Sequence, residues 1–202
     1  MTFTVRGGRI AVSLALGLTV ISQLFYVFVV SQAADGGDGL RRIVWTLEMA
    51  DYTLVAVVSL ALLARDRAMP LVWGMIAIAG IMNIAQVGMG LAMFPPAREI
   101  AEQTPQLFGS ILAGAFFLYF HGKALLGLAA ILVGMAVVAR SGAAAKGLGG
   151  LTVLAGLATA ALNCLAMAVG MDWTWYAGAS GTLATALLAV SLLLVPRQDP
   201  AG

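Results

Sequence analysis

The feature that most constrains the fold is a series of long apolar blocks separated by short polar segments. Five such blocks cover residues 10–31, 43–64, 70–93, 148–169 and 175–195. A helix that crosses the roughly 30 Å hydrocarbon core of a bilayer needs about 20 residues, because lipid offers the backbone no hydrogen-bond partner. The blocks therefore predict an all-α, polytopic integral membrane bundle, with the lipid bilayer as its first partner.

The composition excludes several other classes of protein. Only 10% of the residues are charged and 61% are hydrophobic, whereas a soluble domain carries about 25% charged residues. The 11 Lys and Arg residues are scattered singly or in pairs, so no basic patch for nucleic acid is expected. The single cysteine, Cys164, lies inside an apolar block and cannot form an intrachain disulfide. No metal site is predicted, and no cofactor-binding motif is present.

A sixth apolar stretch, residues 107–139, is too long for one span, since a helix of that length would measure about 50 Å. We predict that residues 119–139 form the fourth span. Residues 107–118 would be a separate interfacial or re-entrant segment on the outer side. Three prolines interrupt the chain just before this stretch, at positions 95, 96 and 105. The sequence thus predicts six transmembrane helices in a single domain, residues 1–202.

The basic residues predict that both termini are cytoplasmic, because Lys and Arg collect in cytoplasmic loops. Seven of them flank the spans on one side and three on the other. The first group comprises Arg6, Arg9, Arg65, Arg67, Arg140, Lys146 and Arg197, and the second comprises Arg41, Arg42 and Arg98. The first apolar block exceeds the 7 to 15 residues of a signal-peptide core, so we expect it to be retained. The predicted location is the cell inner (plasma) membrane.

A few strongly polar side chains fall inside the predicted spans, where each charge costs about 2.5 to 3.5 kcal/mol. Glu48 and Asp51 are three residues apart on the second span and share a helix face. His121 and Lys123 lie near the start of the fourth span. Three amides lie on the third and fifth spans, namely Asn83, Gln86 and Asn163. At 1.5 Å per residue, all of these side chains fall in the outer half of the membrane or at its midplane.

This one-sided distribution of polar residues favours an outward-facing intramembrane pocket. The pocket would bind a small polar or amphipathic molecule or a lipid headgroup. Its predicted ligand-binding residues are Glu48, Asp51, Asn83, Gln86, His121, Lys123 and Asn163. The inner halves of the spans hold only Ser, Thr and apolar side chains apart from terminal basic residues. A pore or a proton wire needs polar groups across the whole membrane, so the distribution disfavours one.

Three alternatives remain open. A small-molecule or proton-coupled transporter could have an inner path of hydroxyls and exposed backbone. A membrane-embedded enzyme could act on a lipid with a carboxylate as general base, although no catalytic residue is identified. A structural or assembly subunit, with a second copy of the chain as a candidate partner, would use the polar residues only to join helices. In that last case Glu48 and Asp51 would form a structural ion pair with Lys123.

Overall fold

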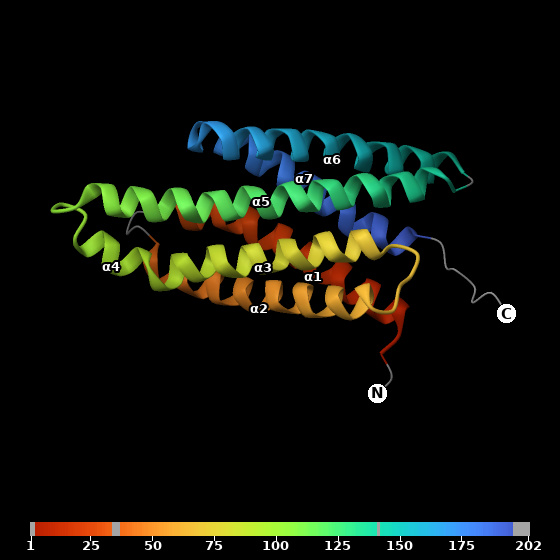
Figure 1. Ribbon diagram of the computed structural model, residues 1–202, viewed down its shortest axis with the longest axis horizontal. Helices are drawn as coiled ribbons and strands as arrows, with labels where there is room; N and C mark the ends of the chain where they lie inside the picture. Colours follow the sequence, from red (N-terminus) through yellow and green to blue (C-terminus); the bar gives the residue numbers. More distant parts are fainter. Residues whose placement is uncertain (1–2, 34–36, 141, 196–202) are drawn as a thin grey trace.

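In the computed structural model, the described residues are 3–33, 37–140 and 142–195, and their regular elements are all helical (Figure 1). Six helices are long and apolar enough to cross a membrane, which confirms the six predicted spans. They are α1 (Val5–Phe28), α2 (Asp38–Leu63), α3 (Pro70–Ala92), α5 (Pro105–Val138), α6 (Ala143–Val169) and α7 (Thr174–Leu194). The short elements are η1 (Val30–Gln32), α4 (Phe94–Glu99) and η2 (Met171–Trp173). The chain is a multi-pass membrane protein.

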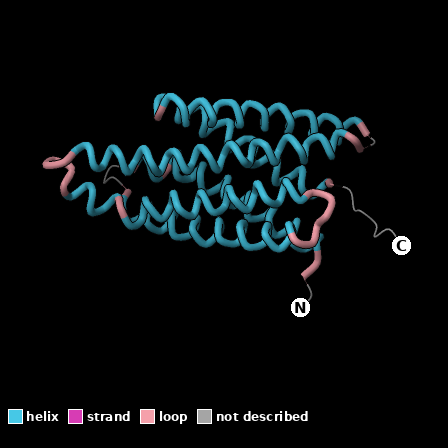
Figure 2. The backbone as a smooth tube through the Cα atoms, viewed as in Figure 1, coloured by secondary structure: helices cyan, strands magenta, loops and turns pink. Residues whose placement is uncertain are grey.

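The helices lie alongside one another in an elongated bundle with two distinct ends (Figure 2). The start of α1 and the end of α7 lie at one end, here called the terminal end (Figure 1). The opposite end carries α4 and is called the α4 end. Helix α5 contacts α3, α6 and α7, while α1 joins α2 to α7. The bundle therefore brings α1, α2, α5 and α7 around a shared interior.

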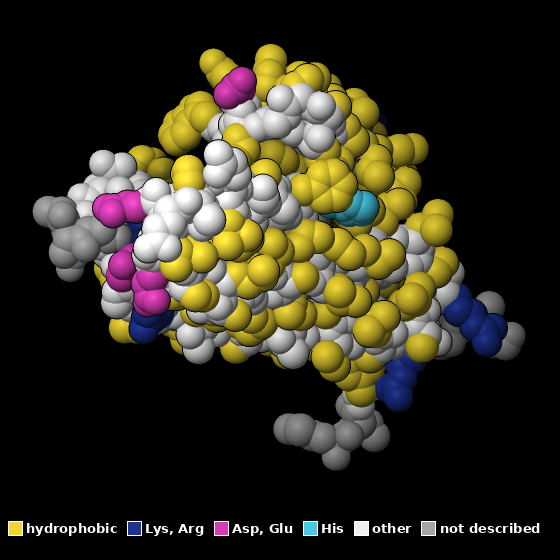
Figure 3. All heavy atoms as spheres, turned by 60° about the vertical axis from the view of Figure 1, so that its left-hand side comes forward, with side chains coloured by type: hydrophobic (Ala, Val, Ile, Leu, Met, Phe, Trp, Pro, Cys, Tyr) yellow, Lys and Arg dark blue, Asp and Glu magenta, His cyan; other side chains and the backbone are white. Residues whose placement is uncertain are grey.

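Large apolar side chains cover much of the outer surface (Figure 3). Leu14 and Leu71 are each 68% exposed, and Leu154 is 65% exposed. Apolar patches of this extent are rare on soluble monomers but are expected where helices face lipid. The exposed apolar side chains and the helix lengths thus both indicate a membrane environment.

The seam between α5 and α6 is a close helix contact, and glycines make it possible. A Cβ atom on Gly127 would lie 2.8 Å from the carbonyl oxygen of Gly156. A Cβ on Gly134 would lie 2.8 Å from the carbonyl oxygen of Gly149. Membrane helices commonly use such small residues to bring their backbones together. The two glycine pairs fix α5 and α6 side by side.

One predicted detail of the fold is wrong. Residues 107–118 form no separate interfacial or re-entrant segment, because they are the first part of the continuous helix α5, Pro105–Val138. Its 34 residues span about 51 Å, and α5 extends beyond α6 at the α4 end (Figure 1). There it packs against α4, where the rings of Phe94 and Phe108 meet edge to face with centroids 5.6 Å apart. A helix longer than the bilayer remains continuous by projecting or tilting, since both keep its backbone hydrogen bonds.

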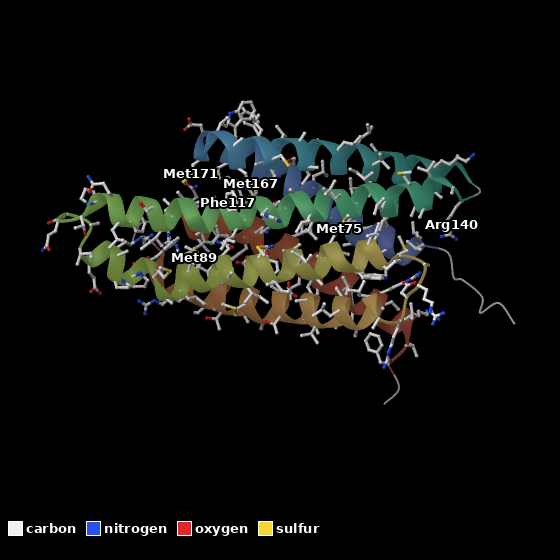
Figure 4. The ribbon with its side chains drawn as sticks, viewed as in Figure 1. Met75, Met89, Phe117, Arg140, Met167 and Met171 are labelled. Carbon is white, nitrogen blue, oxygen red and sulfur yellow. The ribbon has the colours of Figure 1, made fainter. Side chains whose placement is uncertain are left out.

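Polar contacts close the terminal end. Asp66, in the loop between α2 and α3, is 5% exposed. Its carboxylate accepts hydrogen bonds from Arg9 Nη2 at 2.7 Å and from Trp73 Nε1 at 2.9 Å. Arg140, labelled in Figure 4, donates from the end of α5 to the carbonyl oxygen of Leu194 on α7. At the terminal end, Asp66 thus links α1 to α3, and Arg140 separately links the end of α5 to α7.

Candidate functional site

A buried cluster of polar side chains joins four helices in the half of the bundle nearer the α4 end. Helix α1 contributes three of its members, α2 another three, and α5 and α7 one each. We call this group the buried polar cluster; it consists of Thr19, Ser22, Gln23, Glu48, Asp51, Tyr52, Lys123 and Thr182. It contains three of the seven predicted site residues, namely Glu48, Asp51 and Lys123.

The two carboxylates lie on the face of α2 that packs against α1. Glu48 and Asp51 are each 8% exposed. Ser22 donates a hydrogen bond to Glu48 Oε1, and Thr19 Oγ1 donates to Asp51 Oδ2 at 2.6 Å. The donors on α1 are three residues apart, as are the acids on α2, so two helix faces meet in register. Each acid is thus held by a neutral hydroxyl.

Lys123 enters the cluster from α5 and is 0% exposed. Its Nζ donates to Gln23 Oε1 at 2.8 Å and lies 5.5 Å from the centroid of the Tyr119 ring. Its aliphatic part lies against Gly181 of α7, where a Cβ atom would be 2.8 Å from Lys123 Cδ. A residue larger than glycine at position 181 would therefore push the lysine stem out of its place.

Gln23 is the centre of the hydrogen-bond network. Its Oε1 accepts from Lys123 and also from Thr182 Oγ1 at 3.0 Å, while its Nε2 donates to the Tyr52 hydroxyl at 3.2 Å. One amide thus connects α1 with α2, α5 and α7. Because an amide both donates and accepts, it can hold the ammonium group of Lys123 without neutralising its charge.

The charges of the cluster do not balance through direct contacts. Among the described residues, Lys123 forms no direct ion pair with either carboxylate. Lys123 is instead linked to α2 through Gln23, which accepts from its Nζ and donates to the Tyr52 hydroxyl. Ionised carboxylates offer about four acceptor positions each, and Glu48 and Asp51 each accept one hydrogen bond from the described chain. The cluster can therefore accept further hydrogen bonds or hold an additional positive charge.

The other four predicted site residues make no hydrogen bond to the cluster. Asn83 packs against Gly122 of α5 and donates to the carbonyl oxygen of Ala79 at 2.7 Å. Asn163 donates to the carbonyl oxygens of Thr159 and Ala177. Within the described residues, Oδ1 of both asparagines is buried without a hydrogen-bond partner. The two amides thus lie in separate seams, α3 with α5 and α6 with α7.

Gln86 and His121 are both half-buried. Gln86 makes no hydrogen bond within the described part of the chain. The His121 ring meets Phe117, labelled in Figure 4, edge to face at a centroid distance of 6.4 Å. Figure 3 shows the chain's single histidine at the surface among apolar side chains. Both side chains thus lie outside the hydrogen-bond network of the buried polar cluster.

A cavity of about 230 Å³ opens at the α4 end, between the first turns of α2, the end of α3 and α4. Trp45 forms part of its wall, stacks on Tyr26 at 6.1 Å between centroids and meets Phe94 edge to face at 5.8 Å. Gly90 makes room for this indole, since a Cβ there would lie 2.8 Å from the Trp45 ring. Trp45 precedes Glu48 by three residues, about one helical turn. The part of the cavity wall that Trp45 forms thus lies about one helical turn from Glu48 of the buried polar cluster.

Several of the site's residues are absent from the sequence-based prediction. Helix α1 carries a polar stripe that is detectable in the sequence. It consists of Thr19, Ser22 and Gln23, at positions i, i+3 and i+4. The sequence uses the cavity's arginines only to predict the orientation of the bundle. Tyr52 adjoins Asp51 in sequence, and no pattern distinguishes its buried hydroxyl from those of interfacial tyrosines.

Metal binding finds no support in the described parts of the chain, where no three His, Cys, Asp or Glu side chains gather closely enough to hold an ion. In comparisons with known proteins, the chain matches no family model, no curated sequence and no solved structure. Its function is therefore inferred from the geometry of the buried polar cluster and the cavity.

Proposed function

We propose that the protein binds a small polar or amphipathic molecule through Glu48 and Asp51, which the ligand reaches from the α4 end. The observation that carries this proposal is that two buried carboxylates each accept one hydrogen bond from a neutral hydroxyl and form no direct ion pair within the described residues. Ionisable groups inside a membrane are expensive, and they commonly mark a functional site. Because the spare positions are acceptors, a suitable ligand carries a protonated amine or several hydroxyl donors.

The terminal half of the bundle supports binding from one side rather than passage through the membrane. It is filled by a tightly packed apolar core whose members include Trp73, Val133 and Leu188, each 0% exposed. Of the buried hydroxyls there, Thr152 and Ser191 share a hydrogen bond of 2.9 Å and Ser13 donates to the carbonyl oxygen of Ala189. Ser59 Oγ is buried without a hydrogen-bond partner within the described residues. A conducting path needs polar groups that remain available to a solute. The packing therefore favours a binding site that is closed toward the terminal end.

We further propose that the α4 end faces outward from the cell inner (plasma) membrane. Arg6, Arg9, Arg65, Arg67, Arg140 and Lys146 all adjoin helix ends at the terminal end, as cytoplasmic basic residues do. Arg197 lies outside the described residues. This orientation would open the cavity to the outside.

The orientation can be tested by cysteine labelling. In a Cys164→Ser background, an impermeant maleimide added to intact cells is expected to label Gln103→Cys, which lies at the α4 end. Ala144→Cys, at the opposite end, should be labelled only after the cells are lysed. Both native side chains are exposed, so access to the reagent depends on the side of the membrane. The reverse pattern would contradict the orientation.

Ligand binding is tested by thermal unfolding of the purified protein with ethanolamine, putrescine or glycerol as probes. A probe at 100 times its Kd stabilises the folded state by about 2.7 kcal/mol. We expect at least one probe to raise the Tm of the wild type and to have no effect on Glu48→Gln/Asp51→Asn. The amides keep the shape of the acids and an acceptor for Ser22 and Thr19, but they remove both negative charges.

The matched control is Glu102→Gln/Asp172→Asn, which removes two exposed acids at the same end of the bundle. It should respond to the probe as the wild type does. Full stabilisation of a folded Glu48→Gln/Asp51→Asn variant would contradict the proposal, and so would a wild type that responds to none of the three probes.

A further inference from the structure

The cavity at the α4 end is lined by more basic than acidic groups. Three arginines and two acids surround it, namely Arg41, Arg42, Arg98, Asp38 and Glu99. The described lining thus has a formal charge of +1 at neutral pH. The arginines lie where helices α2 and α4 leave the apolar bundle, the level at which a bilayer changes from hydrocarbon to headgroups.

Two of the arginines, Arg41 and Arg98, form ion pairs with the exposed carboxylate of Asp38. Asp38 Oδ1 accepts from Arg41 Nη1 at 2.6 Å and from Arg98 Nη1 at 3.1 Å. Arg41 also lies over the Trp45 ring, with Cζ 5.8 Å from its centroid. Such contacts orient the guanidinium planes before any ligand arrives, which reduces the entropy lost on binding.

The arginines retain unused hydrogen-bond donors. Each guanidinium has five N–H groups, and Asp38 accepts one from each of Arg41 and Arg98. Arg41 Nε is buried and has no hydrogen-bond partner within the described residues. The Arg42 side chain makes no hydrogen bond or ion pair within those same residues. The cavity thus has an excess of cationic donors over acceptors.

We propose that this cavity is an anion site for a phosphate group, bound by the free N–H groups of Arg41, Arg42 and Arg98. The planar guanidinium matches the oxygens of a phosphate, which can accept several charge-assisted hydrogen bonds at once. Trp45 and Phe94 give the same cavity an apolar wall, which suits the organic part of a phosphate ester. The site is separate from the carboxylates of the buried polar cluster and does not depend on a ligand binding there.

The phosphate can belong to a membrane lipid or to a free anion, and one experiment distinguishes them. The full chain is purified in maltoside micelles, which contain no phosphate. Inorganic phosphate is titrated in one arm with sulfate-free buffer, and tryptophan fluorescence is followed because Trp45 lines the cavity. In the other arm, phosphatidic acid or diacylglycerol with the same acyl chains is added, and bound lipid is counted by native mass spectrometry.

The test variant is Arg42→Gln/Arg98→Gln, and the matched control is Arg6→Gln/Arg67→Gln, which removes two exposed arginines at the terminal end. We expect the test variant to bind the phosphate-containing probe at least about tenfold more weakly, since charge-assisted hydrogen bonds are lost. The control should bind like the wild type. Arg42→Gln alone breaks no side-chain hydrogen bond or ion pair with the described residues. It therefore serves as the second variant if the double variant does not fold.

Each result has a defined meaning. Arginine-dependent binding of phosphatidic acid but not diacylglycerol supports a lipid phosphate as the occupant, whereas arginine-dependent binding of inorganic phosphate supports a free anion. The inference is overturned if neither probe binds, if diacylglycerol binds as well as phosphatidic acid while inorganic phosphate does not bind, or if the control variant loses affinity as much as the test variant. Amine binding that persists in Glu48→Gln/Asp51→Asn would contradict the proposed function but would leave these outcomes unchanged, so the two proposals can fail separately.

Discussion

Replacing Asp66 with alanine is expected to destabilise the bundle by about 3 to 5 kcal/mol, the cost of removing one partner from a buried ion pair. Arg9 and Asp66 are 11% and 5% exposed and make two hydrogen bonds, at 2.7 and 3.1 Å. The same carboxylate also accepts from the indole of Trp73, which is 0% exposed. Alanine would remove the carboxylate that accepts from Arg9, from the indole of Trp73 and from the backbone N–H of Ala68.

The measurement is the free energy of unfolding of the purified protein in mixed micelles, with folding monitored by tryptophan fluorescence. Asp66→Asn should have a smaller effect than Asp66→Ala, because its amide oxygen can still accept from Trp73. Asp172→Ala is the control, since Asp172 is exposed and makes no ion pair within the described residues. An Asp66→Ala variant within about 0.5 kcal/mol of wild type, the range of ordinary surface substitutions, would show that this contact adds nothing to stability.

The contact at Asp66 illustrates which parts of the fold the sequence predicts. The six spans follow from block length, because lipid forces each segment to satisfy its own backbone. The Arg65-Asp66-Arg67 loop was interpreted only through its positive charges, so a buried acid between them was not anticipated. The break in α5 was predicted on the assumption that a helix stays within the hydrocarbon. In the structure, α4 supports the projecting part of α5 through the contact between Phe94 and Phe108. Such a tertiary contact cannot be deduced from the length of an apolar block.

The candidate site shows a similar limit. The spacing of Glu48 and Asp51 correctly places both acids on one face of α2. The depth of a residue along a helix does not indicate which neighbouring helix its side chain faces, however. Side chains predicted at similar depths therefore face different neighbours in the structure. Lys123 points into the cluster, whereas His121, two residues earlier and about 200° around the helix, lies against Phe117. Asn163 shares the cluster's half of the bundle but lies in the seam between α6 and α7.

Lys123 is expected to stabilise the buried carboxylates through space, and a double-mutant cycle can measure this. Lys123→Met keeps the aliphatic stem that packs on Gly181 and removes the ammonium group. We expect it to cost about 1.5 to 3 kcal/mol in the wild type, because the charged hydrogen bond from Nζ to Gln23 is lost. In a Glu48→Gln background the cost should fall by a coupling energy of about 0.5 to 3 kcal/mol.

The control cycle pairs Lys123→Met with Asp66→Asn, which lies at the terminal end of the bundle. Distant substitutions of this kind should add within about 0.3 to 0.5 kcal/mol. If Lys123 and Glu48 also prove additive, the lysine acts only through Gln23 and Tyr119, and the acids are stabilised by hydroxyls alone. A measured coupling would instead mean that the ammonium group stabilises the Glu48 carboxylate. The negative charge of Asp51 would then remain for a cationic group of the ligand to neutralise.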